Sequence, residues 1–281
     1  MATAIVIDTH PAGRWLGRFE ALPPLAWLGL QAAALWPHWR WAAARLADGS
    51  DDPLGLAALA VLAVLVFRLE PQLRGEPKPG WLLAALAATA GATAAVFALP
   101  PLIGALLAAL ALAFGLRAFM PSGQALLPMA GLALLALPVV SSLQFYAGYP
   151  LRVVTAQCST WLLQAAGFAA ERSGTAMQVN GQLVIVDAPC SGVQMVWMAY
   201  FCAFAVAAFA GLRDRQLLAR LPFVGMLVLV GNVLRNSVLV ALEAQHAAVP
   251  ELMHQGVGLV ALVGVCSAVA WVIHGGRDAQ A

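Results

Sequence analysis

Long apolar runs, separated by short polar or proline-containing segments, decide what this chain can fold into. About eight runs approach or exceed the roughly 20 residues that a helix needs to cross a bilayer. They cover residues 24–46, 53–67, 80–98, 102–119, 124–145, 190–211, 217–242 and 251–273. Because 62% of the residues are hydrophobic and only 10% are charged, polar residues are too few to cover a water-soluble protein. The sequence therefore predicts an all-α polytopic membrane protein that forms a single integral-membrane domain over residues 1–281.

The distribution of Lys and Arg predicts how these helices are oriented. If residues 1–22 form a cytoplasmic N-terminal tail, ten Lys and Arg residues fall in inner segments and four in outer segments. Such an excess of cations is typical of the cytoplasmic side. The tail lacks the continuous apolar centre of a removable signal peptide. The net charge of +2, without a basic block, gives no indication of nucleic-acid binding.

The longest connection, residues 146–189, lies on the outer side in this orientation and contains two predicted elements. Its first half repeats apolar residues at helical spacing, which predicts an amphipathic helix on the outer face of the membrane. The repeated residues are Leu151, Val154, Cys158, Trp161, Leu162, Ala165 and Phe168. Its second half places Asn180 and Gly181 between two alternating runs, which predicts a small β-hairpin with a two-residue turn. The hairpin leads directly to Cys190.

Cys190 is the first candidate site residue because it opens an apolar helix at the outer surface. It lies in the sequence Asp-Ala-Pro-Cys-Ser-Gly, where the proline suits an early helical position. Unpaired N–H groups at a helix N-terminus stabilise a thiolate, the nucleophilic form of cysteine, and Gly192 leaves room for a substrate backbone. Alternatively, Cys190 is a small buried residue or forms a disulfide with Cys158. Ser191 is a weaker candidate nucleophile because no G-x-S-x-G motif surrounds it.

Two later apolar runs carry polar residues at the depth expected for Cys190. Arg235 lies about two-thirds of the way toward the outer side, where an arginine is costly unless it faces a wet cavity or a partner. Asn232 lies one turn earlier on the same face. His254 opens the last run, and Gly258 follows one turn later. The alternatives are an arginine that pairs two helices and a structural histidine.

The chain resembles the exosortase/archaeosortase family in the order, spacing and predicted depth of its polar residues. Those residues are Cys190, Ser191, Gly192, Asn232, Arg235, His254 and Gly258. The resemblance covers residues 137–263, which would form the catalytic core. Pro189 and Gln194 depart from the family pattern, since many members have a small or acidic residue at the first position and arginine at the second.

The resemblance implies a cysteine transpeptidase or protease of the bacterial inner membrane that acts at its outer face. Its substrates would be exported proteins with a C-terminal tail made of a short motif such as Pro-Glu-Pro, a transmembrane helix and a basic cluster. Cys190 would then be the nucleophile, Arg235 would stabilise the tetrahedral oxyanion and His254 would act as general acid and base. Thioester formation needs these three kinds of group. No cofactor is implied.

Two other functional classes remain as alternatives. A transporter would place Arg235 along a substrate path, although the sequence contains no inverted repeat. A structural subunit of an envelope polysaccharide assembly would need no reactive thiol, so it would tolerate the replacement of Cys190 by serine. The four cysteines lack the spacing of a metal site, and none is predicted.

Overall fold

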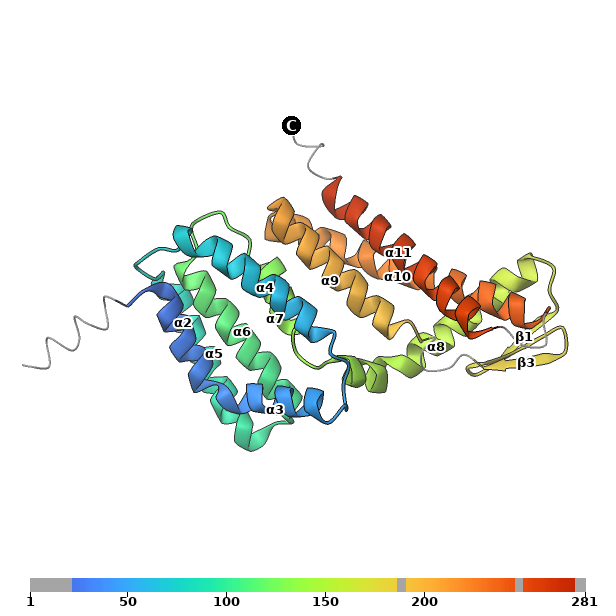
Figure 1. The fold of residues 1–281 in the computed structure, drawn as a ribbon, viewed down its shortest axis with the longest axis horizontal. Coiled ribbons are helices and arrows are strands. Elements are labelled where there is room, and N and C mark those ends of the chain that lie inside the picture. Colours follow the sequence, from blue (N-terminus) through green and yellow to red (C-terminus); the bar gives the residue numbers. More distant parts are fainter. Residues whose placement is uncertain (1–21, 186–190, 246–249, 276–281) are drawn as a thin grey trace, which may run out of the picture. The chain divides into compact units, whose positions relative to one another are not determined.

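The computed structural model describes residues 22–185, 191–245 and 250–275 and shows a mostly helical chain (Figure 1). Within these ranges six helices are long and apolar enough to cross a membrane. A seventh span results if the bent pair α7 (Leu127–Leu135) and α8 (Val140–Ala165) counts as one. The predicted class of helical multi-span protein is confirmed, with six or seven candidate spans in place of about eight.

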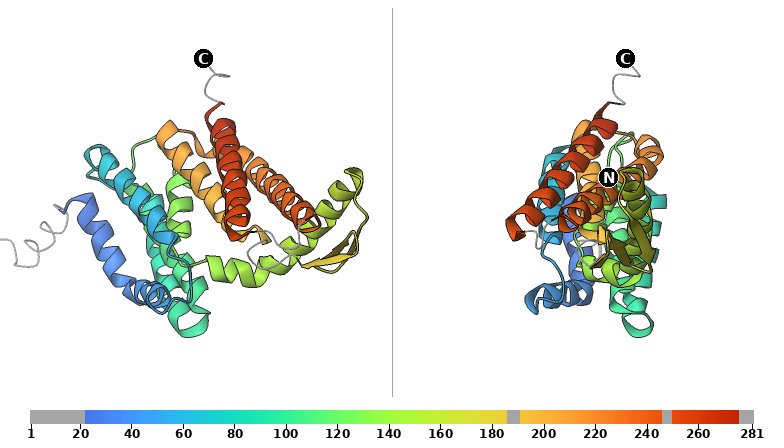
Figure 2. Two further views of the ribbon diagram at one scale, coloured as in Figure 1. Left: turned by 45° about the vertical axis from the view of Figure 1, so that its right-hand side comes forward. Right: turned by 90° about the vertical axis from the view of Figure 1, so that its right-hand side faces the viewer.

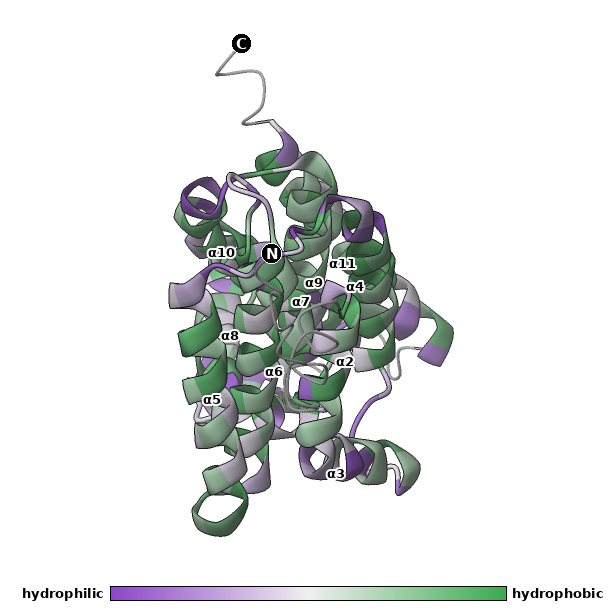
Figure 3. Cartoon of the chain, turned by 90° about the vertical axis from the view of Figure 1, so that its left-hand side faces the viewer, coloured by the Kyte–Doolittle hydropathy of each residue, from purple (hydrophilic) through white to green (hydrophobic). Residues whose placement is uncertain are grey.

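The chain divides into two compact units. One contains the described residues up to Trp39 together with Val66–Ser122, and the other contains Arg40–Leu65 and the described residues from Gly123 onward. Apolar residues follow the helices, and hydrophilic residues gather near helix ends and in α3 (Trp36–Ala47), as Figure 3 shows.

The first unit is built from α2 (Pro24–Ala34), α5 (Pro79–Ala98) and α6 (Pro101–Phe119). Each helix begins with a proline, whose fixed φ suits the first turn and whose missing N–H needs no partner there. Only Leu99 and Pro100 separate α5 from α6, and the two helices pack together as a tight helical hairpin. Small residues such as Ala92, Ala105 and Ala108 form the buried contacts of this unit.

The predicted first span, residues 24–46, is wrong. In its place are α2 with 11 residues and α3 with 12, and neither is long enough to cross a membrane. Pro37 lies in the first turn of α3, where a proline starts a new helix more readily than it continues one.

The second unit contains residues 55–65 of α4 (Gly55–Leu69) together with α7, α8, α9 (Val193–Ala210), α10 (Asp214–Glu243) and α11 (Glu251–His274). The helix α9 packs against α7, α10 and α11, and Figures 1 and 2 show α9, α10 and α11 side by side. Trp197 of α9 is 1% exposed and stacks on Phe201 at 5.3 Å between ring centroids. Its burial places the core of this unit around α9.

A sharp bend of 94° separates α7 from α8. Pro138 lies in the break, and the carbonyl oxygen of Leu135 at the end of α7 accepts a hydrogen bond from Trp197 Nε1 at 3.3 Å. The predicted span at residues 124–145 is therefore not one straight helix. Conversely, α8 runs without interruption through Pro150. The amphipathic helix that was predicted from Leu151 therefore begins 11 residues earlier in the structure, at Val140.

The two faces of α8 have different roles. Its apolar stripe is largely exposed, with Trp161 61% exposed, whereas its buried face carries small and hydroxyl residues. Asn232 Nδ2 of α10 donates a hydrogen bond to Thr155 Oγ1 at 3.0 Å, and Asn236 Nδ2 donates to Ser159 Oγ at 3.0 Å. All four side chains are buried, so these bonds join α8 to α10 in surroundings where polar groups need partners.

A three-stranded antiparallel sheet follows α8 in the order β1 (Ala170–Ser173), β2 (Ala176–Val179) and β3 (Gln182–Ile185). Asn180 and Gly181 connect β2 to β3 with φ of 51° and 83°, as a two-residue turn with two left-handed residues requires. The predicted hairpin is thus confirmed, and β1 adds a strand that was not predicted.

Candidate functional site

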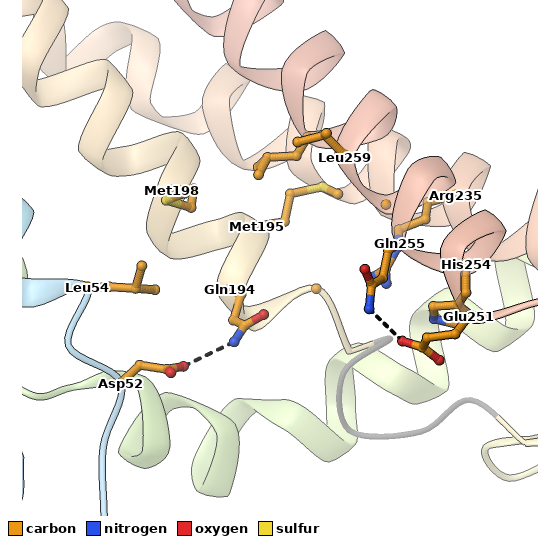
Figure 4. A pocket seen from close by; sticks show the side chains of 13 residues that line it. Asp52, Leu54, Gln194, Met195, Met198, Arg235, Glu251, His254, Gln255 and Leu259 are labelled. Atoms are coloured by element: carbon orange, nitrogen blue, oxygen red, sulfur yellow. Dashed lines mark hydrogen bonds between the residues drawn. The ribbon is translucent and has the colours of Figure 1, made fainter. Parts of the chain in front are cut away.

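A cavity of about 610 Å³ lies within the second unit, between α9, α10, α11 and the segment that precedes α4 (Figure 4). Its apolar lining comes from Leu54, Met195, Met198, Leu259 and Leu262. Its polar lining comes from Asp52, Gln194, Arg235, Glu251, His254 and Gln255. Gly192 and Gly258 complete it, so the cavity brings together four of the residues that the sequence singled out.

Arg235 reaches the cavity across the α10–α11 contact. A Cβ atom added at Gly258 would lie 3.3 Å from Arg235 Nε and 3.5 Å from its Nη2, so the guanidinium lies directly against the backbone of α11. The absence of a side chain at Gly258 is what allows this close approach. The half-buried Arg235 is therefore held at the depth of the first turns of α11.

His254 lies one helical turn before Gly258 on α11 and is half-buried. Figure 4 shows it on the same side of the cavity as Arg235, together with Glu251 and Gln255. Gln255 Nε2 donates a hydrogen bond to Glu251 Oε1 at 2.8 Å. This side of the cavity therefore combines a guanidinium, an imidazole and a carboxylate.

The opposite side of the cavity holds a second polar pair. Gln194 Nε2 of α9 donates a hydrogen bond to Asp52 Oδ2 at 3.0 Å. Asp52 follows Asp51, which is buried and whose Oδ1 accepts a hydrogen bond from the backbone N–H of Ser141 at the start of α8. The hydrogen bond between Asp51 and Ser141 thereby holds the segment before α4 against the N-terminal end of α8.

Gly192 adopts a left-handed conformation, with φ of 83°, immediately before α9. A Cβ atom added there would lie 2.8 Å from Asn232 Cγ and 2.9 Å from Nδ2. Asn232 cannot easily move away, because it is buried and donates a hydrogen bond to Thr155. Both its conformation and its close contact therefore require glycine at position 192.

Ser191 does not line the cavity. Its side chain is 2% exposed. The Oγ atom donates a hydrogen bond to Gln144 Oε1 at 2.8 Å and accepts one from the backbone N–H of Val193 at 3.3 Å. These contacts stabilise the start of α9 and leave Ser191 without the exposure that a nucleophile needs.

Cys190 lies outside the described residues. The described part of the predicted run at residues 190–211 is the helix α9, which begins at Val193 directly after the left-handed Gly192. Cys158, Cys202 and Cys266 are free thiols. Among residues 22–185, 191–245 and 250–275, no group of three or more His, Cys, Asp or Glu side chains is arranged to hold a metal ion.

A comparison of the sequence with protein-family models identifies the family of this chain. The family model described as "Transmembrane exosortase (Exosortase_EpsH)" matches residues 20–272. The chain belongs to the exosortase family. Membership implies a multi-pass membrane transpeptidase that processes C-terminal sorting signals of protein substrates. No curated protein and no solved structure matches the chain.

Several cavity residues of this exosortase were missed by sequence reasoning. Asp52 could not be predicted, because it lies far from α9 in the sequence and reaches the cavity only through the fold. Glu251 and Gln255 carry a local signal, since both lie within one turn of His254 on the same helix. The apolar residues Met195 and Met198 are not distinguishable in sequence from other residues of a membrane span.

Gly192→Ala is expected to destabilise the protein. A left-handed conformation costs a residue with a Cβ atom about 1–2 kcal/mol, and the contact with Asn232 adds to this cost. We expect a lower thermal unfolding midpoint in detergent than for wild type. The matched control is Gly264→Ala in α11, where an added Cβ would meet nothing within 4 Å, and whose midpoint should not fall. Equal midpoints for the two variants would contradict the role of Gly192.

Proposed function

We propose that this exosortase is a cysteine transpeptidase in which Cys190 is the nucleophile, Arg235 stabilises the oxyanion and His254 is the general acid and base. The observation that carries the proposal is that Arg235 and His254 line one cavity together with Gly192, two residues after Cys190. A guanidinium held by Gly258 beside an imidazole is a suitable arrangement for acyl transfer, because one group balances the negative charge and the other moves the proton.

In the first half of the reaction, His254 accepts the proton of the Cys190 thiol. The thiolate attacks the carbonyl carbon of the scissile peptide bond, and the electron pair of the C=O bond forms an oxyanion that faces Arg235. When the oxyanion collapses, the C–N bond breaks and the His254 imidazolium gives its proton to the leaving amine. The product is a thioester between Cys190 and the upstream part of the substrate.

In the second half, neutral His254 accepts a proton from the acyl acceptor, which is an amine in transpeptidation or water in hydrolysis. The acceptor attacks the thioester carbonyl, Arg235 again faces the oxyanion, and the thiolate of Cys190 leaves and is reprotonated. The two halves use the same three groups, so the loss of any one affects both.

The proposal also includes an orientation in the bacterial inner membrane. Five cations lie at the α4–α5 and α9–α10 connections, namely Arg68, Arg74, Lys78, Arg213 and Arg215, and their number supports a cytoplasmic position for these connections, with the starts of α9 and α11 on the outer side. The cavity then faces the compartment in which exported proteins arrive. Its substrates would carry a short motif such as Pro-Glu-Pro, a transmembrane helix and a basic cluster at the C-terminus.

A reporter substrate tests this function directly. We expect an exported reporter that ends in Pro-Glu-Pro, a transmembrane helix and a basic cluster to lose its tail only in cells that produce this exosortase. Its matched control carries Ala-Ala-Ala in place of the motif and should stay intact, as measured by the mass of the released reporter. If both reporters stay intact, the proposed signature is wrong, and if both are cut, the motif is not what the site recognises.

A further inference from the structure

The cavity between α9 and α11 has a polar level and an apolar level. Its polar side chains Glu251, His254 and Gln255 lie in the first turns of α11, at one end of a candidate membrane span. Leu259 and Leu262 line it about two and three turns farther along the same helix. Because the ends of spans lie near the lipid headgroups and their middles among acyl chains, the apolar level lies deeper in the bilayer than the polar level.

The cavity ends where α9 and α11 come into contact. Cys202 lies one turn beyond Met198 on α9, and Cys266 lies one turn beyond Leu262 on α11. Cys202 Sγ donates a hydrogen bond to the carbonyl oxygen of Cys266 at 3.6 Å. The two helices therefore meet at this contact, and the apolar level lies between the contact and the starts of the helices (Figure 4).

The walls of the apolar level are only partly covered by the protein itself. Met195 is buried, and Met198 and Leu262 are half-buried, but Leu259 is 62% exposed although it lines the cavity. An apolar side chain beside open space lacks packing contacts on that side. Because close packing is what stabilises contacts between chains in a bilayer, the apolar level is suited to an apolar segment of another molecule.

The apolar level is continuous with the proposed reacting groups. Arg235 lies against Gly258, and Leu262 lies one turn beyond Gly258 on the same face of α11. One such turn is about 6 Å along the helix axis, a distance that an extended peptide covers in about two residues at roughly 3.3 Å each. A substrate whose scissile carbonyl faces Arg235 can therefore bring its neighbouring residues beside Leu262.

We propose that the apolar level binds the second to fourth residues after the scissile bond and selects large apolar side chains there. The inference rests on the proposed function, in which the exported protein lies upstream of this bond and the membrane-embedded tail lies downstream. The upstream chain leaves toward the membrane surface and the downstream chain enters the bilayer, so the downstream chain runs toward Leu259 and Leu262. Met198 and Leu262, on opposite walls, are then specificity-determining residues of this exosortase.

Tailed reporters that differ only at these three positions test the selectivity. One carries Leu-Leu-Leu and the other Ala-Ala-Ala, and the mass of the released product gives the cleavage site. We expect full-length exosortase in detergent to process the leucine reporter with a KM about tenfold lower, because missing methyl and methylene groups commonly cost an apolar pocket that factor or more. A control reporter with the same exchange in the middle of its membrane helix should match the leucine reporter. Equal KM values for the first two reporters would overturn the proposal.

A substitution in the wall tests the same contact from the side of the enzyme. Leu262→Trp fills the apolar level and should raise the KM for the leucine reporter about tenfold, with a smaller change in kcat, because overpacking commonly costs that much. Val263 is the next residue on α11, is 56% exposed and does not line the cavity, so Val263→Trp should keep the wild-type KM. An equal effect of the two variants would show a general disturbance of α11 and overturn the proposal.

Photocrosslinking locates the bound segment without relying on turnover. Benzoylphenylalanine replaces residue 262 or residue 263 in the Cys190→Ala protein, and mass spectrometry maps the crosslinked residue of the leucine reporter. Position 262 should link to the three leucines, and position 263 should not. Links from position 262 to the chain upstream of the scissile bond, or to phospholipid alone, would overturn the proposal and identify the upstream chain or an acyl chain as the occupant.

Failure of the proposed function has a different result. The wild-type protein would then cut neither reporter, whereas failure of the present inference leaves both reporters cut with the same KM. Crosslinking decides the inference in the first case as well, since position 262 either links to the start of the reporter's membrane helix or does not.

Discussion

Cys190→Ala is expected to abolish processing of a tailed substrate while the protein still accumulates in the membrane. Without the thiol no thioester forms, and the neighbouring Ser191 cannot replace it because its side chain is buried and bonded to Gln144. Loss of a catalytic nucleophile commonly lowers turnover on the order of 1,000-fold or more. The measurement is the rate at which the substrate tail is released in isolated membranes. Cys190→Ser should fail as well, since a serine hydroxyl is a much weaker nucleophile than a thiolate.

The matched control for this substitution is Cys158→Ala, which removes a free, half-buried thiol from α8 and should keep wild-type turnover. A membrane-impermeant thiol reagent applied to intact cells should label the wild-type protein at Cys190 and block processing, which also tests the proposed orientation. Retained turnover in Cys190→Ala would remove the nucleophile from the proposal. Equal loss in both variants would instead favour a structural pairing of the two cysteines.

Arg235→Lys is expected to fold and insert normally yet to turn over substrate about 100-fold more slowly or worse, the usual cost of losing an oxyanion donor. Lysine keeps the positive charge but lacks the planar fork of donors. The guanidinium is also fixed against Gly258, a placement that a flexible ammonium would not reproduce. The same exchange on the same helix serves as the control. Arg220→Lys lies outside the cavity, where Arg220 Nη1 donates a hydrogen bond to the carbonyl oxygen of Ile273, and it should retain near-normal turnover.

His254→Ala should be impaired to a similar degree, because neither the thiol nor the leaving amine would then have a proton partner. Combining it with Arg235→Lys should cost much less than the product of the two single losses, since both residues act on one transition state. Turnover of Arg235→Lys close to wild type would make Arg235 a structural residue. Fully multiplicative losses would show that the two residues act in separate steps.

The sequence predicted those parts of the fold that depend on local information. The boundaries of α5, α6, α10 and α11 lie within about three residues of the predicted runs, because apolar length and flanking proline or charge define a span by themselves. The turn at Asn180 and Gly181 was predicted for the same reason, since its backbone conformation depends on two neighbouring residues.

The remaining features depend on tertiary contacts. The residues of β1, Ala-Glu-Arg-Ser, have no strand propensity, and β1 forms because β2 offers an unpaired edge. The bend after α7 could not be distinguished from a kinked span, because the partner of the Leu135 carbonyl is Trp197, 62 residues away. The helix α8 continues through Pro150 although proline usually ends a helix, since its neighbours α9 and α10 pack along it.

In the candidate site, too, some features follow from the local sequence and others depend on tertiary contacts. Arg235 and His254 were predicted because a charged or titratable residue in an apolar run is conspicuous, and the structure brings both to one cavity. The function of Gly258 as the surface on which Arg235 lies, and the pairing of Gln194 with Asp52, required the packing of separate helices. The roles of Cys190, Arg235 and His254 in catalysis stay predictions.

During biosynthesis, the hydrogen bonds between α8 and α10 can form only after both helices have been synthesised. Thr155 and Ser159 precede their partners Asn232 and Asn236 by 77 residues. At about 5–20 residues per second, the ribosome needs on the order of 4–15 s to make the intervening chain. During this interval α8 is complete, but its hydroxyl face has no amide partners. The α8–α10 interface therefore closes only late in translation, and slower elongation between these helices would lengthen the period in which proteases and chaperones of the membrane can act on α8.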